Sequence, residues 1–74
     1  MKTSYTAPLP NGSIAKRVSR AGRLYSHAII AQAADGSWKA VSWAGNAQLA
    51  ANRVREFSRW PSLSQVQAVP ATPI

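Results

Sequence analysis

The stretch Arg23 to Ala44, "RLYSHAIIAQAADGSWKAVSWA", decides the fold. Two β-compatible runs flank the pair Asp35-Gly36, and an Asp-Gly pair suits the left-handed backbone of a type I′ turn. Because apolar runs on both sides of such a pair are typical of a hairpin, the stretch predicts two antiparallel strands joined by a two-residue loop.

The pairing within this hairpin determines which side chains share a face. With a two-residue loop, Ile30 lies opposite Val41. Ala28 then lies opposite Trp43, and we expect this face, which also holds Leu24, to form the core. The opposite face stays open and carries Tyr25, His27, Ile29, Ala31, Trp38 and Ala40.

A three-residue loop is the alternative. It pairs Ile29 with Trp43 and Ala31 with Val41, because a slip of one residue changes every pair along the two strands. The sequence leaves both registers open, and the assignment of the open face depends on which of them forms.

Gly45 and Asn46 precede a predicted helix. Asn46 is a favourable N-cap, and the sequence continues without a helix breaker until Pro61. A rotation of about 100° per residue gathers an apolar arc that should pack on the hairpin, formed by Ala47, Ala50, Val54 and Phe57, with Leu49 and Trp60 on its shoulder. The opposite side carries a basic and amide-rich stripe, formed by Gln48, Asn52, Arg55 and Arg59.

The segment after Pro61 alternates weakly and predicts a third strand around residues 66–69. A right-handed return through the helix places this strand beside the first strand and antiparallel to it, in the sheet order two, one, three. The predicted fold class is therefore α+β, a ββαβ domain in which one helix covers one antiparallel sheet. We assign residues 23–69 to this domain and residues 70–74, with their two prolines, to a frayed tail.

The first 22 residues predict a flexible or partly helical basic lead-in. Two prolines and an Asn-Gly pair within residues 1–12 favour extended backbone and turns. Residues 13–22 permit a short helix capped by Ser13 and ended by Gly22, with Ile14 and Val18 on one side. A disordered basic arm is the alternative for the same residues.

The charge of the chain indicates the class of partner. Nine Lys and Arg residues against two acidic residues give the 74-residue chain a formal net charge of +7. Such a chain attracts polyanions, with nucleic acid as the commonest partner, followed by an acidic protein surface or an anionic membrane. Membrane adsorption is disfavoured because the Ala-rich apolar arc of the helix is needed for the core. The first residues lack the apolar run of a signal peptide, so we expect a cytoplasmic protein.

Few residues could carry chemistry. The chain has no Cys and a single His, His27, so we expect no disulfide, no zinc site and no other metal or cofactor. Acid–base catalysis needs paired titratable groups. Turn geometry accounts for Asp35, and pairing with Arg53 or Arg59 along the helix accounts for Glu56. Since no Gly-rich phosphate loop of the Walker or dinucleotide kind is present either, we expect that the protein is not an enzyme.

The positive charge and the aromatic side chains together predict a nucleic-acid-binding surface. Lys and Arg neutralise phosphates, and aromatic rings stack on bases. We expect Tyr25 and Trp38 to stack, and Trp43 and Trp60 to belong to the core. The candidate nucleic-acid-binding residues are Lys16, Arg17, Arg20, Arg23, Tyr25, Trp38, Lys39, Arg55 and Arg59.

These observations favour a small non-enzymatic binding protein with a regulatory role. The alternative is a protein-binding inhibitor or adaptor of the kind that phages and mobile elements encode. It would dock on a host protein through a strand edge or an aromatic patch. A homodimer through a sheet edge is also compatible with the pattern, because a three-stranded sheet leaves edges to pair or protect.

Overall fold

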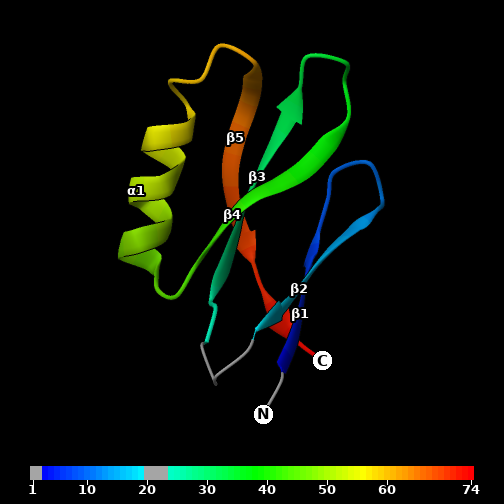
Figure 1. Cartoon of the computed structure of the whole chain (residues 1–74), viewed down its shortest axis with the longest axis vertical. Coiled ribbons are helices and arrows are strands. Elements are labelled where there is room, and N and C mark those ends of the chain that lie inside the picture. The colour runs from blue at the N-terminus through cyan, green and yellow to red at the C-terminus, as the bar shows by residue number, and fades with distance from the viewer. Residues whose placement is uncertain (1–2, 20–23) are drawn as a thin grey trace.

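The computed structural model of the chain describes residues 3–19 and 24–74. Its elements are the strands β1 (Thr3–Pro8), β2 (Ile14–Ser19), β3 (His27–Ala33) and β4 (Trp38–Ala44), the helix α1 (Ala47–Phe57), and the strands β5 (Leu63–Pro70) and β6 (Thr72–Pro73). The strands form two antiparallel three-stranded sheets, in the orders β2-β1-β6 and β4-β3-β5 (Figure 1). The α+β class is confirmed. The predicted ββαβ layout differs from the structure in detail, because it lacks the β2-β1-β6 sheet.

The β3–β4 hairpin closes with three loop residues. The Gly36 N–H donates to the Ala33 carbonyl at 2.9 Å, and the Ala33 N–H donates to the Ser37 carbonyl at 2.8 Å. Gly36 has a φ of 88°, whereas Asp35 lacks the positive φ that a type I′ turn requires at both central residues. The predicted two-residue loop is therefore wrong, and the loop is a β-turn that ends in one left-handed glycine.

The register of this hairpin changes at a bulge. Ala28 lies opposite Trp43, as the two-residue loop predicts, but Ile30 lies opposite Ala40. A register shift halfway along β3 leaves Val41 as an extra residue on β4. Consequently neither predicted register holds along the whole hairpin.

The C-terminal strands connect the two sheets. β5 lies beside β3 and antiparallel to it, and β4 lies on the other side of β3. The Ala71 N–H then donates to the Ser26 carbonyl at 3.0 Å, and the Ile74 N–H donates to the Ser4 carbonyl at 2.8 Å. These bonds contrast with the frayed tail that the prolines suggest. β6 is an edge strand, where a proline leaves no ladder hydrogen bond missing.

β1 and β2 form the first hairpin of the chain, where the sequence predicts a lead-in. Pairing is continuous from Thr3 opposite Ser19 to Pro8 opposite Ile14. The predicted short helix and the alternative disordered arm are therefore wrong over β2, and residues 20–22 lie outside the described part of the chain. The spacing of Ile14 and Val18 that suggests a helix face also fits one face of a strand, because alternate strand residues share a face.

α1 begins at the predicted N-cap. The Leu49 N–H donates to Asn46 Oδ1 at 2.7 Å, which satisfies one of the free N–H groups of the first turn. The residues that pack on the sheet are Leu49, Ala50, Val54 and Phe57. Two members of the predicted apolar arc do not pack there. Ala47 is exposed. Trp60 is 52% exposed because α1 ends at Phe57 and the chain turns before Trp60. No helix among the described residues has the length and apolar character that crossing a bilayer requires.

Both faces of the β4-β3-β5 sheet are covered. Alternation along β3 sends Ile29 into an apolar cluster with α1 and Ile30 into a second cluster with Ala7 of β1, and both isoleucines are fully buried. Figure 1 shows α1 on one side of this sheet and the β1–β2 hairpin on the other. The predicted open sheet face is therefore wrong, because α1 covers the face of Ile29 that was expected to be open. The first hairpin covers the face of Ile30, which was expected to pack on the helix. Leu24, predicted in the core, is 72% exposed.

Candidate functional site

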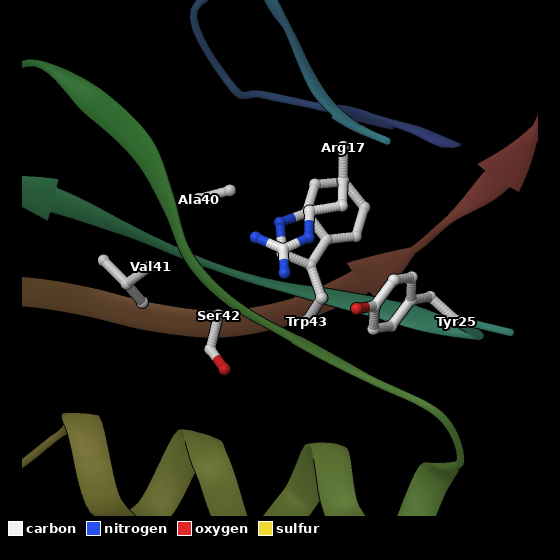
Figure 2. Close-up of a pocket in the computed structure, with 6 residues that line it drawn as sticks. All are labelled: Arg17, Tyr25, Ala40, Val41, Ser42 and Trp43. Carbon is white, nitrogen blue, oxygen red and sulfur yellow. The ribbon is translucent and has the colours of Figure 1, made fainter. Parts of the chain in front are cut away.

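A hollow lies between β2 and β4, which are edge strands of the two sheets (Figure 2). Its volume is about 290 Å³, and it is lined by Arg17, Tyr25, Ala40, Val41, Ser42 and Trp43. Figure 2 shows the side chains of Arg17, Tyr25 and Trp43 close to one another, although they come from three separate segments of the chain. We call this feature the β2–β4 hollow.

Strand alternation places the side chains of the β2–β4 hollow. Arg17 lies opposite Tyr5 in the first hairpin, and directly paired residues project from the same face of a sheet. Because Tyr5 is buried, this face looks toward the other sheet. Trp43 lies opposite Ala28, which belongs to the apolar cluster shared with β1. The two sheets therefore direct Arg17 and Trp43 into the same space between them.

Tyr25 joins the residues of this space into one cluster. Its ring meets Tyr5 edge to face, with centroids 5.5 Å apart and an interplanar angle of 82°. The Trp43 ring is tilted by 56° at a centroid distance of 6.0 Å. Arg17 Cζ lies 5.8 Å from the Tyr25 centroid, within the about 6 Å range of a cation–π contact. Tyr5, only 3% exposed, anchors the cluster in the core, so the exposed end of Arg17 is held beside two aromatic rings.

Arg17 is paired with no carboxylate in the described part of the chain. The one ion pair found there joins Arg53 Nη1 to Glu56 Oε2 at 3.7 Å on α1, which is the local pairing that the sequence predicts. Asp35 lies in the β3–β4 loop, where the Ser37 hydroxyl donates to its Oδ1 at 2.6 Å and the Ser37 N–H at 2.9 Å. These two hydrogen bonds lower the pKa of Asp35 below its ordinary value. The guanidinium of Arg17 is thus free to meet an external anion.

α1 and the turn after it carry a second basic surface. Its predicted residues Gln48, Asn52, Arg55 and Arg59 are all exposed. A shallow depression of about 210 Å³ lies among Asn52, Arg55, Glu56 and Arg59. Because α1 and the first hairpin cover opposite faces of the β4-β3-β5 sheet, this surface faces away from Arg17. The two predicted basic regions therefore form two separate surfaces.

The predicted site residues fall into several places. Arg17 and Tyr25 line the β2–β4 hollow, whereas Lys16 and Lys39 are exposed outside its lining. Arg55 and Arg59 belong to the second basic surface. Arg20 and Arg23 lie outside the described residues. The structure thus brings together two of the nine predicted residues in one concave feature.

Trp38 is placed differently from the prediction. It is half-buried and packs against the apolar cluster of Ala7, Ala28 and Ile30. The predicted pairing puts Trp38 on the open face with Ile29, but the bulge at Val41 moves it to the face of Ala28 and Ile30. The first hairpin covers that face with Ala7, so Trp38 lies between the two sheets. Trp38 is therefore no free stacking platform on an open sheet.

Trp43 is the functional candidate that sequence reasoning missed. Its predicted place in the core is only part of its role, because it packs against the cluster around Ile30 and also lines the β2–β4 hollow. The Ala28–Trp43 pair is readable from the sequence, but no local signal indicates that β2 lies near this tryptophan. The hollow exists only because two hairpins that are separate in the sequence pack together.

The remaining chemistry-bearing side chains form few contacts. Ser26 Oγ and His27 Nδ1 lie 2.7 Å apart, and this hydrogen bond joins sequence neighbours. Within residues 3–19 and 24–74, no three side chains of the types His, Cys, Asp and Glu gather as a metal site would require. That the protein binds no cofactor and catalyses no reaction stays a prediction.

Comparison of the chain with protein-family models, with curated protein sequences and with solved structures found no match. Function is therefore argued from the charge and geometry of the surfaces described above.

Proposed function

We propose that the chain is a small non-enzymatic binding protein that engages nucleic acid, with the β2–β4 hollow at the centre of the contact. The observation that carries this proposal is the position of Arg17, an exposed cation without a carboxylate partner in the described chain, beside the rings of Tyr25 and Trp43. A guanidinium meets phosphate oxygens with two parallel hydrogen bonds, and aromatic rings stack on bases.

The net charge supports the same proposal. At +7 the chain attracts polyanions over several ångströms before contact, and such attraction raises the rate of association with nucleic acid. Lys16 of β2 and Lys39 of β4 are exposed and add positive charge to the two strands that border the hollow. Arg20 and Arg23 stand in the sequence between β2 and β3, so they add to the basic character of this part of the chain.

The test is a fluorescence anisotropy titration with a labelled single strand and with a duplex of the same sequence. We expect affinity to fall as salt rises from about 50 mM to about 200 mM, because counterions are released when phosphates are neutralised. The variant Arg17→Gln should reduce the slope of log K against log salt by about 0.7 for the single strand, the contribution of one phosphate contact. Arg59→Gln removes the same charge from the second basic surface and serves as the matched control.

If Arg17→Gln and Arg59→Gln lower the affinity for nucleic acid equally, the binding is only a non-specific attraction by net charge. The proposal also fails if neither nucleic acid binds at a physiological ionic strength of about 150 mM.

Protein binding is the second candidate, and one observation favours it. Ile14 and Val18 are 61% and 52% exposed on β2, and β2 is an open sheet edge. An inhibitor or adaptor that docks on another protein would use such an edge and such apolar side chains. Binding of this kind tolerates moderate salt, and the double variant Ile14→Thr/Val18→Thr should weaken it while leaving nucleic-acid binding unchanged.

A further inference from the structure

We infer that the β2–β4 hollow accepts a single unpaired nucleobase, so that the protein selects single-stranded over double-stranded nucleic acid. This inference rests on the proposed function and adds to it the form of nucleic acid that is bound and the group that enters the molecule.

The walls of the β2–β4 hollow are aromatic. Trp43 and Tyr25 present two aromatic rings at a centroid distance of 6.0 Å, and both line the hollow. The edge-to-face contact with buried Tyr5 holds the Tyr25 ring in place. A rigid aromatic wall costs little conformational entropy when a flat group stacks against it. A nucleobase is such a group, and every base offers a face for stacking.

The backbone of β4, at the edge of its sheet, offers hydrogen-bonding groups to the hollow. Ala33 and Ser37 share a backbone hydrogen bond across the hairpin, and antiparallel pairs alternate between bonded and non-bonded types. This alternation makes the pair of Ile30 and Ala40 a non-bonded one. The N–H and C=O of Ala40 therefore point away from β3, toward the open edge that lines the hollow. One donor and one acceptor side by side match the hydrogen-bonding edge of a base.

The size of the hollow suits one base. At about 290 Å³ the hollow lies just below the roughly 300–1,000 Å³ range of small-molecule sites, which suits one planar ring system and excludes a longer segment of polymer. A base inside a duplex is stacked on its neighbours and paired, so it enters a pocket only after energy is spent on extruding it. An unpaired base in a single strand needs no such extrusion, which gives the selectivity.

The charges favour a polyanion over the other occupant that an open strand edge invites, an extended peptide. Arg17 stands at the hollow without a carboxylate partner in the described chain, and the exposed Lys16 precedes it on the same strand. A strand of nucleic acid places a phosphate on each side of an inserted base, within reach of these side chains. A peptide of ordinary composition would leave Arg17 without a compensating anion.

The test compares two single strands with the same number of phosphates, a short oligothymidine and an oligonucleotide of the same length built of abasic sites. The third probe is the duplex of the oligothymidine. At physiological salt the oligothymidine should bind about fivefold to about 150-fold more tightly than the abasic strand, the range expected from stacking one base. The indole N–H signal of Trp43 should shift in the NMR spectrum with oligothymidine, and the signal of Trp60 should stay in place.

Variants show which aromatic ring produces the preference for oligothymidine. Tyr25→Leu should abolish the preference for oligothymidine over the abasic strand, whereas Tyr25→Phe should keep it because the ring remains. Trp60→Leu removes an exposed aromatic from the far side of the molecule and should leave the preference intact. A thermal unfolding curve for each variant shows that it is folded under the conditions of the titration.

The outcomes separate the two proposals. If the oligothymidine and the abasic strand bind equally, the base plays no part and the inference is overturned, while phosphate-based binding stands. If none of the three probes binds at physiological salt, the inference and the proposed function both fail, and a peptide on the β4 edge becomes the better explanation of the hollow.

Discussion

Substitution of Ile29 tests the central feature of the fold, which is that both faces of the β4-β3-β5 sheet are buried. Ile29 and Ile30 are neighbours in β3, and each has 0% of its surface exposed. Ile29 packs with α1, and Ile30 packs with the first hairpin. If one face of the sheet were open, one of the two isoleucines would be exposed and its truncation would cost almost nothing.

The expected magnitude follows from the loss of one methylene group in a packed site. Ile29→Val and Ile30→Val should each lower the free energy of unfolding by about 0.5–1.5 kcal/mol. For a domain of this size, that loss lowers the melting temperature by about 2–12 °C. Valine is preferred to alanine because an Ile→Ala change costs about 2–5 kcal/mol, a large part of the roughly 4–11 kcal/mol that a 74-residue domain has.

The assay is urea unfolding followed by tryptophan fluorescence, with the slope m compared among variants to confirm that the same surface is exposed on unfolding. Ile14→Val is the matched control, because Ile14 is 61% exposed and should change stability by less than about 0.5 kcal/mol. An Ile29→Val variant as stable as Ile14→Val, with Ile30→Val destabilised, would refute the burial of both faces of the β4-β3-β5 sheet.

Three further predictions concern local structure. Asn46→Ala should destabilise the fold by about 0.5–2 kcal/mol in urea unfolding, because the N-cap bond to the Leu49 N–H is lost, while Asn46→Ser should retain most of the stability. Gly36→Ala should cost about 1–2 kcal/mol in the same assay, since φ at this position is 88° and the added methyl meets no close atom, so backbone strain is the cause. The hydrogen bonds from Ser37 depress the pKa of Asp35 in the folded state, so their stabilisation is present above the unfolded value of about 3.9 and is lost as pH falls through the lower folded value. Urea midpoints measured below pH 4 should therefore fall less steeply in Asp35→Ala than in the parent chain, and identical slopes would argue against this contribution.

Local signals in the sequence were sufficient for the second hairpin, the helix and the strand that follows it. Asn46 caps α1 as its side chain predicts, and the helix ends before Pro61. Ala28 faces Trp43 as predicted. The cap and the hairpin depend on contacts between residues close in the chain, whose energies a local pattern contains. β5 is marked by its own alternation, although its partner β3 lies far away in the sequence.

The candidate site was predictable only in part. Arg17 and Tyr25 are recognisable as a cation and an aromatic, but their meeting with Trp43 depends on how the first hairpin docks. Trp38 shows the same limit of prediction from sequence. The sequence places Trp38 on the same face as Ile29, but the bulge at Val41 moves it to the face of Ile30, against which Ala7 and Leu9 pack.

The sequence by itself determined the net charge, the scarcity of titratable groups, the β3–β4 hairpin and the capped helix, because each follows from composition or from residues a few positions apart. Only the tertiary structure decided that residues 3–19 form a sheet with the C-terminus, that both faces of β3 are buried, and that a hollow opens between β2 and β4. A six-residue segment such as β2 has no stable conformation of its own, so its backbone hydrogen bonds with β1 decide what it becomes.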